Sequence, residues 1–66
     1  MKAFNVEYGT KVIVTEENVQ IPIAATPINK GDKITILRLD GVYCNGIDKN
    51  GDRVYIDAMT EVEPCV

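Results

Sequence analysis

Hydrophobic and polar residues alternate with a period of two along most of the chain. The clearest case is KITILRL at 33–39, where Ile34 and Ile36 lie on one side of an extended strand. No window has the apolar repeat of about 3.6 residues that an amphipathic helix requires. The pattern therefore predicts one all-β domain spanning 1–66, with about five to seven short strands. The other segments with this pattern are 2–8, 11–15, 18–24, 42–48, 53–57 and 61–64.

Two of these segments have features that restrict their place in a sheet. Pro22 cannot donate a ladder hydrogen bond, so 18–24 is expected to be an edge strand or an arm of a loop. Residues 1–8 place Phe4 and Tyr8 on one face and are expected to form an added N-terminal strand. Such a strand would cover the sheet or, at an edge, contact a second copy of the chain.

The dipeptide Asn50-Gly51 predicts a tight hairpin, because a two-residue type I′ turn needs positive φ at both central positions. With these residues at the tip, oppositely charged side chains face each other near the turn, and Tyr55 lies across the backbone of Gly46. A slip of one residue would move every side chain to the opposite face. The predicted pairs are Lys49–Asp52, Asp48–Arg53, Ile47–Val54, Gly46–Tyr55 and Asn45–Ile56.

From residue 30 onward, several short motifs follow one another in a characteristic order. They are Lys30-Gly31-Asp32, Ile34-Thr35-Ile36-Leu37, Asp40-Gly41, Tyr43-Cys44-Asn45-Gly46, Asn50-Gly51, Ala58-Met59-Thr60 and Glu61-Val62-Glu63-Pro64. In this order and spacing they resemble the Src-homology-3-like (SH3-like) family of small β-barrels. The resemblance covers a little over half of the chain. It implies an SH3-like barrel with a short 3₁₀ turn near 58–60, and a first strand followed by a long RT-type loop within 11–29.

Composition and charge limit the kinds of partner. The chain has 66 residues, 45% of them hydrophobic, and a formal net charge of −3. This length suits one small domain. The sequence contains no run of Lys or Arg, which argues against direct binding of nucleic acid. The acidic balance favours a protein partner that presents a basic segment.

The residue types that carry most catalytic and metal chemistry are scarce. There is no histidine, and Cys44 and Cys65 do not form a CxxC pair, so a zinc site is not expected. Asp48-x-Asn50-x-Asp52 has the spacing of a calcium loop, but the positions for its Gly and its bidentate Glu hold other residues. No residue pair reads as a nucleophile with its base. We therefore expect a protein that is not an enzyme and that binds neither metal nor cofactor.

The cellular setting is predicted from what surrounds the alternating segments. The first residues lead directly into alternation, without the apolar core of a signal peptide, and no apolar stretch has the length of a membrane span. A cytoplasmic protein without membrane contact is expected. In that compartment Cys44 and Cys65 are expected as reduced thiols, although a disulfide is conceivable if the C-terminus returns beside the hairpin.

The SH3-like resemblance also implies a binding groove. In peptide-binding members an aromatic platform receives a polyproline helix, and the first platform Trp falls on Tyr43. The other platform positions hold Cys44, Ala58 and Glu61, so polyproline recognition is not expected. The loops would instead surround Tyr43 with carboxylates that suit an Arg- or Lys-bearing segment. The alternative is that these carboxylates only solvate the loops. This acidic rim consists of Glu16, Glu17, Asp40, Asp57 and Glu61.

Three functions follow from these observations. The first is a small protein–protein interaction module, an accessory or modulator of a larger machine such as those encoded by bacteria and their phages. The second is a nucleic-acid-associated barrel, or an acidic mimic of nucleic acid that blocks its reader. The third is a structural subunit that assembles with itself through residues 2–8.

Overall fold

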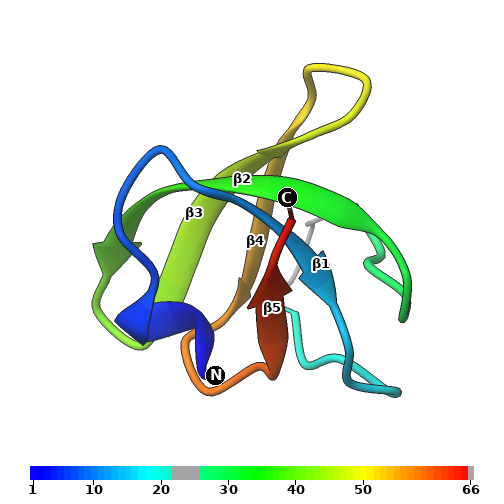
Figure 1. The fold of residues 1–66 in the computed structure, drawn as a ribbon, viewed down its shortest axis with the longest axis horizontal. Helices are drawn as coiled ribbons and strands as arrows, with labels where there is room; N and C mark the ends of the chain where they lie inside the picture. The colour runs from blue at the N-terminus through cyan, green and yellow to red at the C-terminus, as the bar shows by residue number, and fades with distance from the viewer. Residues whose placement is uncertain (22–25, 66) are drawn as a thin grey trace.

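The computed structural model describes residues 1–21 and 26–65, which form one antiparallel sheet of five strands. A short 3₁₀ helix, η1 (Ala3–Asn5), precedes the sheet (Figure 1). The strand order is β4-β3-β2-β1-β5, so the first and last strands in the sequence are neighbours. The strands are β1 (Lys11–Val14), β2 (Lys33–Asp40), β3 (Tyr43–Asp48), β4 (Arg53–Asp57) and β5 (Val62–Pro64).

The sheet coils around its core without closing. Figure 1 shows β2 crossing the whole width of the molecule, with β1 and β5 on one side of the core and β3 and β4 on the other. Among the described residues β4 and β5 form the two ends of the ladder and are not paired with each other. The all-β prediction and the lower of the predicted strand numbers are therefore confirmed, whereas a closed barrel is not observed.

The core consists of the inward-facing residues of this coiled sheet. Alternation in β2 buries Ile34 and Ile36, as predicted, and the same period buries Val54 and Ile56 in β4. Val19 and Ile21 of the long β1–β2 connection pack against the core without forming a strand. Residues 22–24 of the predicted segment 18–24 lie outside the described residues. The buried hydrophobic residues are Ala3, Val6, Val12, Val14, Ile28, Ile34, Ile36, Cys44, Val54, Ile56, Ala58 and Val62.

A β-bulge at Leu37 divides β2 into two halves. Ile36 is opposite Gly46 while Arg38 is opposite Asn45, so Leu37 is an extra residue in the β2–β3 ladder. Such an insertion bends the strand and increases its twist. Beyond the bulge, Leu39 is opposite Cys44 and therefore shares the face of that buried residue.

The hairpin is present, but its predicted register is wrong by one residue. Gly46 is opposite Val54 and Asn45 is opposite Tyr55, so none of the five predicted pairs forms. Gly51 has φ +84° whereas Asn50 does not have positive φ, which excludes a type I′ turn. The loop is a type I turn followed by a left-handed glycine, with the Gly51 N–H bonded to the Asp48 carbonyl at 3.1 Å.

The side chain of Asp48 explains why the longer loop forms. Its Oδ1 accepts the backbone N–H groups of Asn50 and Asp52, each at 2.9 Å. The Asp48 N–H in turn donates to the Asp52 carbonyl at 2.9 Å, which makes 48 and 52 the last bonded pair. Gly46 consequently faces inward, where an added Cβ would lie 2.6 Å from the carbonyl oxygen of Thr35.

Residues 1–8 do not form the predicted added strand. A single bridge joins Lys2 to Glu61, and the chain then turns into η1. The Ala3 N–H donates to the carbonyl of Thr60 at 2.9 Å and the Phe4 N–H to that of Ala58 at 3.0 Å. These bonds and the complete burial of Ala3 hold the segment across the turn between β4 and β5. That turn contains one 3₁₀-type bond, from the Thr60 N–H to the Asp57 carbonyl at 3.0 Å.

Candidate interaction surface

Four exposed large hydrophobic side chains gather around one shallow hollow of about 440 Å³. We call it the apolar hollow. The four large hydrophobic residues are between 40% and 67% exposed, and Val42 is the most exposed of them. Single exposed hydrophobic residues are common on proteins, but a contiguous group is typical of an interaction site. The lining residues are Phe4, Leu39, Gly41, Val42, Asp57, Ala58 and Met59.

Backbone hydrogen bonds hold the three segments of the hollow in place. The Ala58 N–H donates to the Val42 carbonyl at 2.8 Å, which fixes the β4–β5 turn against the β2–β3 turn. The Phe4 N–H donates to the Ala58 carbonyl and brings η1 to the same place. Leu39 enters from β2 because the bulge at Leu37 places it on this face. The hollow is therefore built on fixed backbone.

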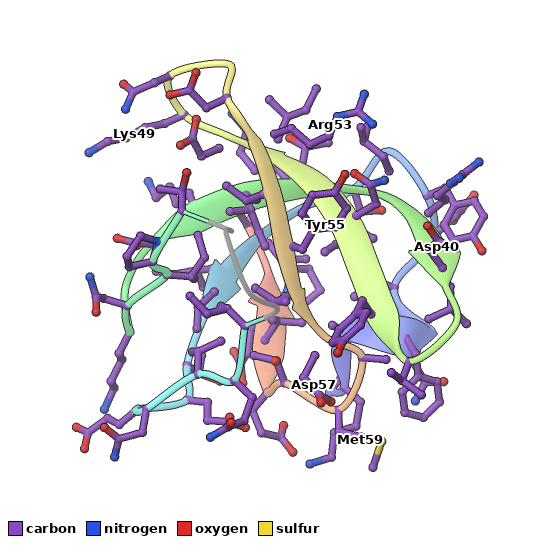
Figure 2. All side chains as sticks on the ribbon, turned by 180° about the vertical axis from the view of Figure 1, so that it is seen from behind. Asp40, Lys49, Arg53, Tyr55, Asp57 and Met59 are labelled. Atoms are coloured by element: carbon purple, nitrogen blue, oxygen red, sulfur yellow. The ribbon has the colours of Figure 1, made fainter. Side chains whose placement is uncertain are left out.

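Asp57 supplies the acidic group at the border of the hollow. Its Oδ1 accepts the Met59 N–H at 2.8 Å, and its own N–H donates to the Gln20 carbonyl at 3.0 Å. Figure 2 shows Asp57 at the end of β4 and Met59 just beyond it. Burial and, to a lesser extent, the Asp57 carboxylate raise the pKa of the nearby Cys44 thiol. Cys44 is thus a protonated core residue, and both cysteines are free thiols.

Three residues predicted to bind a partner do come together. Tyr43 is opposite Asp40 on β2 and opposite Asp57 on β4, so the three form one row across the end of the sheet. Tyr43 and Asp40 are exposed, and Arg38 lies 3.7 Å from the Asp40 carboxylate. An ion pair this open to solvent contributes little to stability, so the Asp40 charge stays accessible. The row adjoins the apolar hollow through Asp57.

The other three residues of the acidic rim are engaged with the chain itself. Glu16 accepts the Glu61 backbone N–H at 3.2 Å, and Glu17 lies 3.7 Å from the Lys30 ammonium. The Glu61 carboxylate pairs with Lys2 at 2.5 Å and with the N-terminal ammonium of Met1 at 3.4 Å. The hydrogen bond with Lys2 lowers the pKa of Glu61 and raises that of Lys2. Glu61 thus connects Met1, Lys2 and Glu16 at the start of β5, whereas Glu17 and Lys30 pair within the β1–β2 connection.

The hydrophobic residues of the hollow were not part of the predicted site. Phe4 was expected only as cover for the sheet or as a subunit contact, and Leu39 as part of the strand at 33–39. A signal was nevertheless present at Met59, which stands in the predicted turn at 58–60, where polar residues are usual. Val42 was expected to begin the strand at 42–48 but lies in the turn before β3. The hydrophobic pattern of a single segment does not show which short turns meet in the fold.

The described residues offer neither a metal centre nor a membrane-spanning helix. Within 1–21 and 26–65, no three His, Cys, Asp or Glu side chains gather as metal ligands. No helix in these ranges has the length and apolar character needed to cross a membrane.

Comparison with known proteins gives no family. The chain matches no protein-family model, and no curated protein or solved structure shows significant similarity to it. The chain is therefore described as a small domain built on a five-stranded antiparallel sheet.

Proposed function

We propose that this protein is a small non-catalytic interaction module with SH3-like architecture. Support for the architecture comes from the strand order β4-β3-β2-β1-β5, from the long connection between β1 and β2, and from the tight hairpin between β3 and β4. The 3₁₀-type bond before β5 and the closing Glu61-Val62-Glu63-Pro64 segment agree with the same family pattern. Such folds carry many functions, so the function is argued from the surface.

The observation that carries the proposed function is the apolar hollow with its acidic border. Phe4, Leu39, Val42 and Met59 offer apolar contact area, and Asp57 and Asp40 place two carboxylates beside Tyr43. A partner segment that combines one or two apolar side chains with an Arg or Lys fits this surface. Its apolar side chains would be buried in the hollow, and its Arg or Lys would pair with the carboxylates. Tyr43 adds an exposed ring with a hydroxyl, a side chain enriched in such interfaces.

An affinity pull-down from lysate of the native host, after nuclease treatment, tests this function. The test variant is Val42→Ser/Met59→Ser, which removes apolar surface from two turns without touching the core. Tyr8→Ser is the matched control, because Tyr8 is equally exposed but does not line the hollow. One stoichiometric partner is expected with the wild type and with Tyr8→Ser, and its loss is expected with the double variant.

The charge requirement is tested with the same partner. Asp57→Asn keeps an oxygen that can accept the Met59 N–H but removes the charge, so binding should weaken and lose part of its salt dependence. Retention of the partner by Val42→Ser/Met59→Ser would overturn the proposed site. Absence of any stoichiometric partner, together with a dimer in light scattering that the same substitutions abolish, would favour the self-assembling subunit instead.

A further inference from the structure

The sheet collects cations on its outer face although the chain is acidic. The register places Lys11 opposite Thr35, Thr35 opposite Ile47 and Ile47 opposite Arg53, so these four residues form one row across β1 to β4. Because strands lie about 4.8 Å apart, the row spans about 14 Å from Lys11 to Arg53. Lys33 lies two residues before Thr35 and therefore on the same face. The sequence contains no run of basic residues that would indicate this arrangement.

Three lysines of this region line one hollow. Lys11, Lys33 and Lys49 surround a depression of about 190 Å³ whose remaining walls include Thr35 and Ile47. Lys33 and Lys49 also line a second, polar hollow of about 390 Å³ between residues 26–33 and the hairpin tip. The two hollows therefore share a border made of Lys33, Asp48 and Lys49. Figure 2 shows Lys49 extending from the hairpin tip.

These lysines have no acidic partner among the described residues. The chain's other two lysines, Lys2 and Lys30, are held in ion pairs with Glu61 and Glu17. Lys11, Lys33, Lys49 and also Arg53 form no ion pair within 1–21 and 26–65.

The carboxylates that face the same hollows are already hydrogen-bonded. Asp48 lines both hollows, but its Oδ1 accepts two backbone N–H groups of the hairpin loop. Asp32 lines the larger hollow, and its Oδ2 accepts the Asn29 N–H at 2.9 Å. Glu63 is opposite Ile13, which is opposite Lys33, so a third carboxylate shares this face. These three carboxylates will weaken the attraction of an anion to the lysines.

An aromatic ring and an amide continue the same face toward the middle of the hairpin. Tyr55 lies two residues after Arg53 on β4, and Figure 2 shows both along the same side of that strand. Asn45 is opposite Tyr55 and opposite Arg38, so the three form a second row beside the first. The Oδ1 of Asn45 is buried and has no hydrogen-bond partner in the described part of the chain. The face thus combines cations with a ring on which a base can stack.

We propose that this outer face binds single-stranded nucleic acid. Lys11, Lys33 and Lys49 contact backbone phosphates, Arg53 extends the track, and Tyr55 stacks on a base. Stacking on Tyr55 needs an unpaired base, which favours a single strand over a duplex. The lysines lie outside the apolar hollow, whereas Tyr55 is two residues before Asp57, which borders that hollow.

The test is fluorescence anisotropy of labelled oligothymidine and oligouridine with the purified full chain across a salt series. Nonspecific binding of this kind should have a dissociation constant of about 1–100 μM at physiological salt and be tighter at about 50 mM salt. Each lysine that neutralises a phosphate contributes about 0.7 to the slope of log affinity against log salt. Lys33→Gln and Lys49→Gln should therefore each weaken binding by about eightfold at about 50 mM salt and reduce that slope.

Matched controls separate a site from general attraction. Lys30→Gln changes the net charge by the same amount outside the track and should leave the affinity within about twofold. Tyr55→Leu should weaken binding by about fivefold or more, while Tyr55→Phe, which keeps the ring, should not. A melting curve for each variant shows that it is folded.

Three results would overturn the proposal: no anisotropy change with either strand, equal effects of Lys30→Gln and Lys33→Gln, or equal binding of a poly-glutamate peptide. Tight binding of a duplex that Tyr55→Leu leaves unchanged would also overturn it, because stacking on an exposed base would then have no part. Loss of the protein partner of the apolar hollow bears on none of these outcomes, so the two proposals fail separately.

Discussion

At the scale of single residues, the buried polar side chains show where the fold is not optimal. Thr60 is 1% exposed, and its Oγ1 has no hydrogen-bond partner among the described residues. The backbone of Thr60 is fully used, because its N–H bonds to Asp57 and its carbonyl accepts the Ala3 N–H. An unpaired buried hydroxyl costs about 1–3 kcal/mol, whereas an apolar group of the same shape does not.

Thr60→Val should therefore stabilise the protein by about 1 kcal/mol. In a domain of this size that gain corresponds to a rise in the melting temperature of about 4–8 °C, measured by circular dichroism. Thr15→Val makes the same chemical change at an exposed site and should alter stability by less than about 0.5 kcal/mol. A lower melting temperature for Thr60→Val would mean that the hydroxyl has a partner in solution.

At the scale of elements, the hairpin shows how far a local pattern can be trusted. Asn50-Gly51 correctly located the turn, but the same dipeptide fits both a two-residue loop and a type I turn with a following glycine. The choice depends on Asp48, whose carboxylate bonds two backbone N–H groups and so favours the longer loop. Alternation located the strands around Ile34 and Val54 because burial in a strand repeats every two residues. The hydrogen bonds of the Asp48 side chain leave no such repeat in the sequence, so the loop type was not predicted.

The two loop types predict different effects of two alanine substitutions. Gly51 has φ +84°, so Gly51→Ala should destabilise the protein by about 1 kcal/mol or more. Asn50 does not have positive φ, so Asn50→Ala should change stability by less than about 0.5 kcal/mol. Urea unfolding of both variants measures the difference. Equal losses of stability would instead indicate the type I′ turn, in which both positions need positive φ.

The structure of the N-terminal segment and the apolar hollow cannot be predicted from any single segment of the sequence. Residues 1–8 alternate like a strand, yet the donors of Ala3 and Phe4 bond to carbonyls that only the folded turn at 58–60 provides. In the same way Phe4, Val42 and Met59 come from three segments distant in sequence. The row of Tyr43 with Asp40 and Asp57 was predictable, since the SH3-like resemblance implies which strands are neighbours. The apolar hollow was not predictable, since it forms between elements.

At the scale of the whole molecule, Glu61 joins the two ends of the chain. Its carboxylate pairs with Lys2 and with the ammonium of Met1, while Val62 donates its N–H to the Met1 carbonyl at 2.8 Å. The pKa of Glu61 is lowered from 4.5, chiefly by the hydrogen bond with Lys2. The stabilisation from this group is therefore present above the unfolded-state pKa and is lost as the pH falls through the lower folded-state pKa.

Glu61→Gln should consequently flatten the acid side of the stability curve. The urea midpoint of the wild type should fall more steeply between about pH 5 and pH 2 than that of the variant. Glu63→Gln, at an exposed position of β5 without an ion pair in the described structure, serves as control and should keep the wild-type slope. Identical slopes for all three proteins would show that the Glu61 contacts do not persist in solution.

The hydrogen bond with Glu61 raises the pKa of Lys2. The stabilisation from Lys2 is therefore lost on the alkaline side, as the pH rises through that raised pKa.

The bulge at Leu37 has a consequence for how this chain should be compared with others. Before it, even-numbered residues of β2 face the core, and after it the odd-numbered Leu39 does. A related chain that lacked this one residue would keep Arg38 on the outer face and Leu39 at the hollow, only with a straighter strand. Evolution can therefore delete or insert a residue here without exchanging the two surfaces. An alignment that allows no gap at Leu37 would pair the residues of one surface with those of the other.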